Sequence, residues 1–170
     1  FNNAGTGHSA LCELNYTPEK NGRIDVSKAM AINEKFQLSR QFWSYLVEQG
    51  VLGNPSEFIN AVPHMSFANG MKQVDYLKAR YEALKDHPLF PNMQFSDSEE
   101  KFKESVPLMA KGRDFNNPVA ISWFDNGTDI NYGALTRQYL DAVVERGVTV
   151  RYGTEAAVDG LRWRVGPVVS

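Results

Sequence analysis

The side chains best suited to chemistry are concentrated at the start of the chain. Residues 1–8 contain two glycines, two asparagines, one threonine and one histidine. Because glycine has no Cβ, the backbone near Gly5 and Gly7 can approach a flat or anionic ligand closely. An ordinary surface turn has a similar composition, and Gly5-Thr6-Gly7 alone is a weak motif. This glycine-rich segment is therefore a candidate ligand site that needs support from the rest of the chain.

Three histidines are the candidates for proton transfer near neutral pH, because histidine is the residue type that ordinarily titrates there. His87 precedes a proline at the expected end of a helix, where an imidazole often only contacts the last carbonyl groups. His64 follows Pro63 in an apolar strand, where a buried structural histidine and a functional one are both open interpretations. His8 lies in the glycine-rich segment and is the preferred candidate.

Several classes of site are not supported by the sequence. No His-Glu-x-x-His or multi-cysteine spacing occurs, so we predict no metal site. A Gly-x-Ser-x-Gly elbow is absent, and so are the GxGxxG and GxxxxGK[ST] loops that bind dinucleotides and triphosphates. With 18 basic and 20 acidic residues, the chain has no bulk attraction to nucleic acid. The single cysteine, Cys12, is compatible with a reducing compartment.

The elements that must position these residues follow a mixed α/β (α+β) pattern without internal repeats. Apolar periodicity, caps and breakers predict helices over 26–49, around 74–84 with Pro88 as the stop, over about 96–104 from a Ser96/Glu99 capping box, and over 133–146. Extended runs predict strands over 58–67 with a break at Pro63, and over 93–95, 119–124 and 148–152, with a hairpin at Asp159-Gly160. We expect a turn at 125–127 and a loop over 107–118.

Four ordered blocks of the sequence resemble one family, the flavin-dependent malate:quinone oxidoreductases. Four long, unusual blocks in the right order are far more specific than a short motif. The resemblance extends to about Val158, and residues 161–170 add nothing to it. The blocks are residues 2–18, 62–67, 108–114 and 127–137.

The resemblance implies a Rossmann-like, FAD-binding flavoprotein of the D-amino-acid oxidase type, of which this chain is an internal fragment, mostly substrate domain. Residues 1–23 would be the flavin-facing loop of the FAD domain, 24–124 the substrate-binding domain, and 125–170 the return into the FAD domain. The dinucleotide fingerprint would precede residue 1, which would account for its absence. The isolated fragment would be inactive.

The implied reaction is oxidation of (S)-malate to oxaloacetate in the tricarboxylic acid cycle, with hydride transfer to FAD and electron transfer to a membrane quinone. FAD would supply the redox chemistry while the protein positions and polarises the substrate. His8, or alternatively His64, would accept the hydroxyl proton. The resemblance further implies a cytoplasmic protein, peripheral to the inner face of a bacterial cell membrane.

The same resemblance assigns the remaining site residues. Arg113 could form a bidentate pair with a substrate carboxylate, although an ion pair with Asp114 is equally open. Arg137 is a weaker candidate, since it could simply cap a helix or face solvent. The residues expected to contact the flavin are Asn2, Asn3, Gly5, Thr6 and Gly7.

Two alternatives to this function stay open. The glycine-rich segment would also suit FAD-dependent oxidation of another 2-hydroxy acid, and a fragment standing alone could be a non-catalytic binding module. Asn69 and Ser105 stand where family members commonly carry tryptophan, a difference that bears on stability more than on chemistry.

Overall fold

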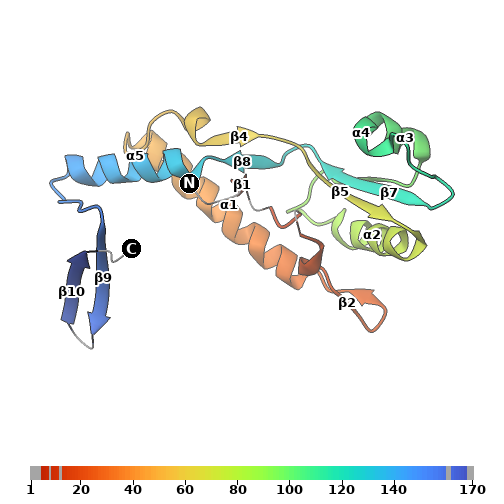
Figure 1. Ribbon diagram of the computed structural model, residues 1–170, viewed down its shortest axis with the longest axis horizontal. Helices are drawn as coiled ribbons and strands as arrows, with labels where there is room; N and C mark the ends of the chain where they lie inside the picture. Colours follow the sequence, from red (N-terminus) through yellow and green to blue (C-terminus); the bar gives the residue numbers. More distant parts are fainter. Residues whose placement is uncertain (1–4, 8, 12, 160–161, 168–170) are drawn as a thin grey trace.

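A computed structural model describes residues 5–7, 9–11, 13–159 and 162–167, which form a mixed α/β structure (Figure 1). The helices are α1 (Ser27–Glu48), α2 (Met71–Leu84), α3 (Glu99–Ser105), α4 (Pro107–Ala110) and α5 (Tyr132–Glu145), with 3-10 turns η1 (Leu14–Tyr16) and η2 (Pro55–Glu57). The strands are β1 (Thr6–Gly7), β2 (Glu19–Lys20), β3 (Arg23–Ile24), β4 (Ile59–Ala61), β5 (His64–Asn69), β6 (Gln94–Ser96), β7 (Val119–Phe124), β8 (Thr128–Ile130), β9 (Thr154–Asp159) and β10 (Arg162–Pro167).

A long antiparallel ribbon forms the backbone of the fold. In it β5 pairs with β7 and β4 pairs with β8, so the two strand pairs continue one another across a break (Figure 1). Ala61 pairs with Thr128 and His64 with Phe124, which is three residues along one strand and four along the other. The extra residue forms a bulge at 125–127, since a bulge sets two residues against one. The predicted turn at 125–127 therefore exists, but it bends the ribbon without reversing the chain.

One further strand completes a three-stranded sheet at each end of the ribbon. The sheet orders are β1-β8-β4 and β5-β7-β6, and the hairpins β2-β3 and β9-β10 stand outside them. Every pairing among the described strands is antiparallel. The mixed α/β class is confirmed, whereas the Rossmann-like domain of the D-amino-acid oxidase type stays a prediction, as do the domain boundaries 1–23, 24–124 and 125–170.

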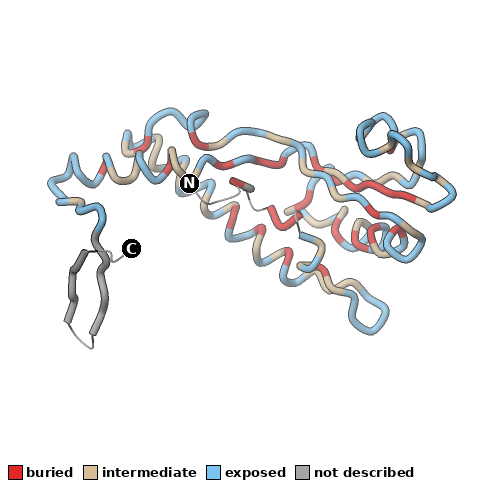
Figure 2. Tube along the Cα trace, viewed as in Figure 1, coloured by how far each residue is buried: buried red, intermediate tan, exposed pale blue. Residues whose placement is uncertain are grey.

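Strand β7 is the most buried element, and it lies between β5 and β6 (Figure 2). Its apolar run has no polar alternation because helices cover it: α2 and α3 both contact β7. Leu77 of α2 packs with Ala120 on one side, while Phe102 of α3 packs with Ile121 on the other. Burial on both faces thus explains why five of the six residues 119–124 are apolar, with the buried Ser122 as the exception.

Helix α1 confirms the predicted helix over 26–49 to within one residue at each end. Its start is stabilised by the Asp25 carboxylate, which accepts hydrogen bonds from the backbone N–H and the hydroxyl of Ser27. Gly50 ends it with φ +66°, a left-handed conformation that suits glycine. Phe36 is buried as expected, whereas Phe42 and Tyr45 are about half exposed.

Helix α2 holds the segment that follows the glycine-rich residues. The Tyr76 hydroxyl lies 2.7 Å from the Leu14 carbonyl oxygen and 2.8 Å from that of Thr17. Arg80 is fully buried, and its Nε donates to the Thr17 hydroxyl at 3.0 Å. These long-range contacts hold Leu14 and Thr17 against α2.

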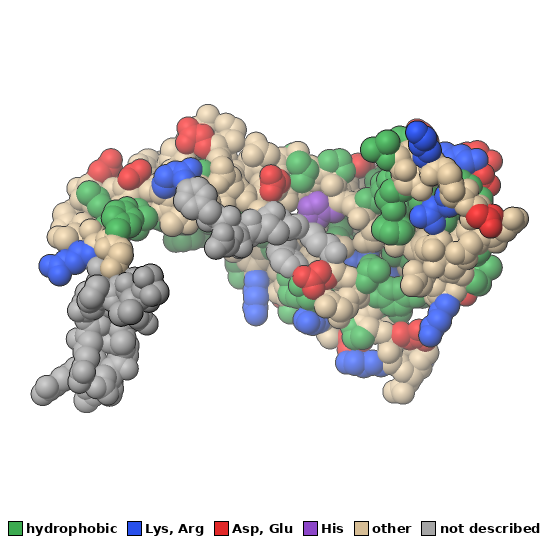
Figure 3. Space-filling view, viewed as in Figure 1, with side chains coloured by type: hydrophobic (Ala, Val, Ile, Leu, Met, Phe, Trp, Pro, Cys, Tyr) green, Lys and Arg blue, Asp and Glu red, His purple; other side chains and the backbone are tan. Residues whose placement is uncertain are grey.

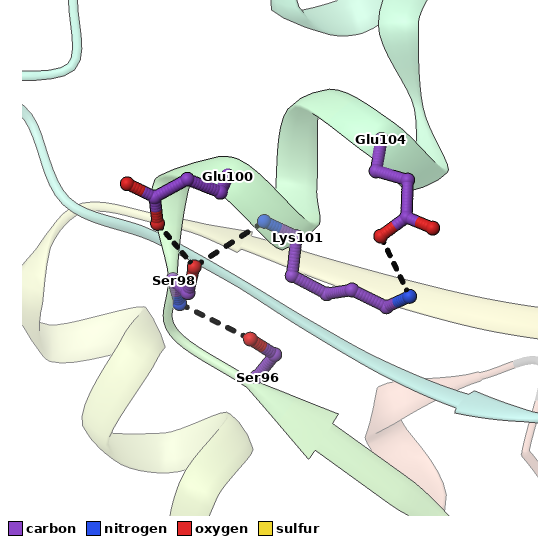
Figure 4. A network of polar contacts seen from close by, with 5 residues as sticks. All are labelled: Ser96, Ser98, Glu100, Lys101 and Glu104. Carbon is purple, nitrogen blue, oxygen red and sulfur yellow. Dashed lines mark hydrogen bonds and ion pairs between the residues drawn. The ribbon is translucent and has the colours of Figure 1, made fainter.

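Helix α3 begins two residues later than the capping box predicts. Ser98 is the N-cap, because its hydroxyl oxygen accepts from the Lys101 backbone N–H at 3.2 Å (Figure 4). Ser96 instead accepts from the Ser98 backbone N–H, and the Ser98 hydroxyl donates to Glu100. This hydrogen bond lowers the pKa of the Glu100 carboxyl. The helix was predicted correctly, but its capping residues were not.

Three further elements differ from the sequence-based expectation. The predicted loop over 107–118 contains α4, which starts with Pro107 at a position where a missing N–H costs nothing. The short strand β8 was not predicted, while the strand expected over 148–152 does not form. Helix α5 and the β9-β10 hairpin around Asp159 are as predicted.

Candidate functional site

The glycine-rich segment enters the fold as the edge strand β1, paired with β8. Thr6 is opposite Asp129, and Gly7 is opposite Thr128. A Cβ on Gly7 would lie 2.8 Å from the Thr128 carbonyl oxygen and would overlap the Thr128 hydroxyl. Gly5 has φ +76°, and a Cβ there would lie 2.7 Å from Asp129 Oδ1. The two glycines therefore permit close approach of β8, which is a reason for glycine that composition did not reveal.

His64 lies where the ribbon bends, next to β8. Its Nε2 is 3.3 Å from the Thr128 carbonyl oxygen. Because a carbonyl only accepts hydrogen bonds, Nε2 carries the proton in this contact. The ring is half-buried, and its tautomer is set by the strand that pairs with the glycine-rich segment.

Gly127 determines how His64 sits. A Cβ at this position would collide with the His64 ring and with the Val62 carbonyl oxygen. The Gly127 carbonyl oxygen also accepts from the Val62 backbone N–H at 2.9 Å. The bulge that contains Gly127 thus brings the imidazole against the backbone, an arrangement typical of bulges beside functional sites.

A cleft of about 600 Å³, here named the α1–β8 cleft, lies beside the bulge and is lined by Gly127 and Thr128 but not by His64. This size is within the usual range for small-molecule sites. One wall carries Ser9 and Thr128, both buried, whose hydroxyls have no hydrogen-bond partner among the described residues. Polar groups buried in this way are rare and call for an explanation. The facing wall is formed by Asn33, Gln37, Arg40 and Gln41 of α1.

A chain of hydrogen bonds orders the α1 wall of this cleft. The Arg40 guanidinium donates to Gln37 Oε1 at 3.2 Å, and Gln37 Nε2 donates to Asn33 Oδ1 at 2.8 Å. Asn33, buried to 1% exposure, donates in turn to the Leu89 carbonyl oxygen at 2.7 Å. The spacing of three and four residues places these side chains on one face of the helix.

Arg137 lies beside a second cavity, of about 880 Å³, at the start of α5. This cavity also includes Asp129, the strand partner of Thr6. The side chain of Asn131 caps α5 by accepting from the Ala134 backbone N–H at 2.9 Å, so Arg137 is not the cap. Arg137 is exposed, and its predicted contact with substrate stays a prediction.

Arg113 lies near the opposite end of β5 from His64. Its Nη1 donates to Asn69 Oδ1 at 2.9 Å, and its guanidinium lies 5.3 Å from the centre of the Phe102 ring. His64 and Asn69 are the first and last residues of β5, about 17 Å apart at the usual rise of a strand. No ion pair with Asp114 is formed among the described residues. The described contacts give Arg113 partners in its own region, and its role in substrate binding stays a prediction.

For several predicted site residues the structure describes no side chain. Asn2, Asn3 and His8 lie outside the described residues, and Thr6 is described only through its backbone. Sequence reasoning missed Ser9, Thr128 and Arg40. The only available signal for Arg40 was its spacing from Asn33 and Gln37 on one helix face, because the opposite wall comes from distant parts of the chain.

The molecular surface shows no dominant charge. On the face seen in Figure 3, acidic and basic side chains are interspersed among the coloured residues. Within the described part of the chain, no helix combines the length and apolar character needed to cross a lipid bilayer.

Comparison with known proteins identifies the family. The family model for malate:quinone oxidoreductase (Mqo) matches residues 1–164. The chain is 78% identical over 168 residues to a probable malate:quinone oxidoreductase of Corynebacterium jeikeium (strain K411), and 66% identical to the malate:quinone oxidoreductase of Corynebacterium glutamicum (strain ATCC 13032). Each alignment covers 97% of this chain and 34% of the relative.

A more distant relative agrees. A probable malate:quinone oxidoreductase of Rhodococcus jostii (strain RHA1) is 55% identical over 156 residues, which is 91% of this chain and 31% of that protein. The chain thus spans about a third of the length of these curated relatives. The resemblance noted in four blocks extends over nearly the whole chain, which belongs to the malate:quinone oxidoreductase family.

Proposed function

We propose that this chain is part of a longer FAD-dependent enzyme that oxidises (S)-malate to oxaloacetate and passes the electrons to a membrane quinone. The observation that carries the proposal is the family match over residues 1–164. The relatives' names identify malate and quinone as their substrates. The tricarboxylic acid cycle, a peripheral membrane position and the cytoplasmic side of the membrane follow only as part of this proposal.

The described residues are compatible with a ligand at β1, although not for the reason that the glycines suggested. Gly5 and Gly7 are required by β8, so their lack of Cβ is not support for a flavin. The support for a ligand is instead the position of β1, which pairs with β8 beside the cavity that contains Asp129 and Arg137. When bound, FAD would supply the electron-accepting chemistry. The residues that this chain would contribute to its surroundings are Asn2, Asn3, Gly5, Thr6 and Gly7.

The proton of the malate hydroxyl needs a base close to the substrate. His64 is one candidate, because its ring lies 3.3 Å from the carbonyl oxygen of Thr128, on the strand that pairs with the glycine-rich segment. His8 stays the other candidate, since it belongs to the segment that forms β1. Exposed Arg137 and half-buried Arg113 remain proposed partners for substrate carboxylates.

The test is made on the full-length protein. We expect a yellow protein with a flavin spectrum that bleaches anaerobically on addition of malate and reduces a soluble quinone. A colourless protein without malate-dependent reduction would refute the proposal, and bleaching by another 2-hydroxy acid alone would favour that substrate.

Paired histidine variants then identify the base. His64→Asn should slow malate-dependent flavin reduction by about 10² or more if His64 is the base. His8→Ala is the matched variant, and the larger loss assigns the role. Dissociation constants for oxaloacetate show whether each protein retains its site, and equal rates in both variants and wild type would exclude both histidines.

A further inference from the structure

Helix α1 carries apolar side chains on two opposite faces. Phe36 is buried in the core, whereas Leu38, Phe42 and Tyr45 are 63%, 54% and 55% exposed. Steps of four and three residues place these three side chains on one face of the helix, here named the α1 outer stripe. Phe36 and Leu38 are two residues apart and so point about 200° from one another around the helix. A helix that is apolar on both faces is typical of an element buried on both faces.

The described contacts account for the core face of α1 and leave the outer stripe uncovered. On the core face the Trp43 ring packs edge-on against Phe36 and Phe58, with ring centres 6.4 and 6.1 Å apart. Among the described residues, no apolar cluster includes a member of the outer stripe. Single exposed apolar residues are normal, but a contiguous patch of them indicates an interaction surface.

The rest of the full-length protein is the cover that the openness of this fold favours. About two thirds of the length of the relatives lies outside the region that this chain matches. The described buried residues form four separate clusters of three to seven residues, whereas a complete domain usually has one contiguous core. The chain exposes 11424 Å², about 3,000 Å² more than a compact monomer of 19.1 kDa.

A second copy of this chain fits the observations less well. Large exposed apolar side chains also lie on β5 and α4, where Phe67 is 47% and Leu108 is 89% exposed. A two-fold contact covers one continuous patch, about 800 Å² per partner at the usual size. It would leave most of the additional exposed area open, whereas a longer chain can cover several elements at once.

A lipid surface also fits less well. Helices that lie on membranes carry lysine and arginine along the polar face that borders the apolar one. Beside the outer stripe acidic and basic side chains are mixed, with Glu34 and Lys35 near its start and Glu48 near its end. The chemistry around the stripe therefore favours a protein surface as its cover.

We propose that the α1 outer stripe is an internal docking surface, buried in the full-length protein against an apolar segment that lies outside residues 1–170. This inference rests on the part of the proposed function that makes the chain a portion of a longer protein, and not on its reaction. Tyr45 lies at one end of the stripe, where a phenol can bury its ring and keep its hydroxyl at a polar rim. The docked segment would fix α1, whose other side lines the α1–β8 cleft.

Hydroxyl-radical footprinting of the full-length wild-type protein tests the docking directly. Oxidation of Phe42 and Tyr45 is measured by mass spectrometry in the native protein and in urea. We expect both side chains to be oxidised at least about 10-fold more slowly in the native protein. If the stripe faces solvent, the exposed fractions predict about half of the rate in urea, and that result would overturn the inference.

The same measurement distinguishes the other two covers. Protection by the rest of the chain should be equal at about 0.1 and 10 µM protein, with or without vesicles of phosphatidylethanolamine and phosphatidylglycerol. Protection that disappears on dilution would assign the stripe to a second copy, and protection that requires vesicles would assign it to lipid. Either of these results refutes internal docking.

A pair of variants adds a stability measurement. Phe42→Gln removes a ring from the stripe, and Glu48→Gln places the same side chain at an exposed polar position near the end of α1. In the full-length protein Phe42→Gln should lower the melting temperature by about 5 °C or more, and Glu48→Gln by less than about 1 °C. Phe42→Leu keeps an apolar side chain and should recover part of the loss. Equal melting temperatures in Phe42→Gln and the wild type would contradict the docking.

The outcomes also separate this inference from the proposed function, because neither measurement requires flavin or malate. A colourless protein with protected Phe42 would support the docking surface and refute the function. Malate oxidation by a protein whose Phe42 reacts at about half of the rate in urea would support the function and refute the docking surface.

Discussion

The two ends of the β5–β7 ladder are built in different ways. At the His64 end, the chain brings together β1, β4, β8 and α1, which come from widely separated parts of the sequence. At the Asn69 end, the surroundings are mostly local: α3, α4 and the loop to β7 follow one another between residues 99 and 118. The first end holds buried polar groups and cavities, whereas the second is closed by Phe102, Val119 and Ile121.

The His64 end therefore contains the candidate catalytic residue, whereas the side chains described at the Asn69 end stabilise the fold. His64 is fixed by backbone groups of Gly127 and Thr128, which leave little freedom for its ring. Arg113 is held by the side chain of Asn69 in an exposed network that includes Asn117. Substitutions at the His64 end should therefore affect folding and ligand binding together. Substitutions of the exposed polar groups at the Asn69 end should have small effects that are confined to stability.

The largest effect is expected for Gly127→Ala. A Cβ would collide with the Val62 carbonyl oxygen and the His64 ring, and backbone cannot yield as a flexible side chain can. We expect a loss of about 3 kcal/mol, at the upper end of the range for overpacking. Thermal melting of the full-length protein measures this loss.

Gly53→Ala is the matched control for that variant. A Cβ at Gly53 would meet only Gln138, at 3.7 Å, which is ordinary contact. Its melting temperature should stay close to that of the wild type. Equal behaviour of the two variants would show that the bulge tolerates a side chain and that His64 is held less firmly than described.

An intermediate effect is expected for Ser98→Ala at the Asn69 end. Loss of the N-cap bond to the Lys101 backbone N–H should cost about 1 kcal/mol. The Ser98 hydroxyl also lowers the pKa of Glu100 from its ordinary value of 4.5. A carboxyl whose pKa is lowered by folding stabilises the protein above its unfolded pKa, and this contribution is lost as pH falls through the folded pKa.

The pH dependence tests that assignment. The difference in melting temperature between wild type and Ser98→Ala should be full at pH 7 and should shrink as the pH falls below about 4.5. A difference that is independent of pH would remove Glu100 from the network and leave only the cap.

The smallest effect is expected for Asn69→Ala. Its amide oxygen accepts from Arg113 and Asn117, but all three groups lie near solvent, so we expect a loss of about 0.5 kcal/mol by thermal melting. Malate kinetics should not change. Comparison with Arg113→Ala then sharpens the contrast: a raised KM in Arg113→Ala alone would return Arg113 to substrate binding and join the two ends into one site.

Sequence patterns predicted the elements whose cause is local. Helix α1 carries helical periodicity and ends before Gly50, and β7 is a six-residue strand that is apolar except for Ser122. Each was predicted within a residue because periodicity and breakers act over short distances. The capping residue of α3 was misplaced by two positions, since Ser96 and Ser98 both have a hydroxyl able to accept a backbone N–H.

Elements that depend on distant partners could not be predicted in this way. Strand β8 has three residues, and it exists because β1 and β4 flank it. Residues 148–152 are rich in β-branched side chains, yet they pair with no strand among the described residues. Strand propensity is expressed only where a neighbour is available. The α1–β8 cleft was missed for the same reason, because its two walls are far apart in sequence.

The hydrogen bonds from α2 to Leu14 and Thr17 have a consequence for motion. Tyr76 and Arg80 tie the backbone and side chain of Leu14 and Thr17 to a helix that is itself packed on β5 and β7. A displacement of α2 would therefore also move Leu14 and Thr17, which follow the glycine-rich segment in the chain. Strand β1 is thus attached to β8 while Thr17 is attached to α2, so a shift of α2 relative to β8 would act on the chain between them.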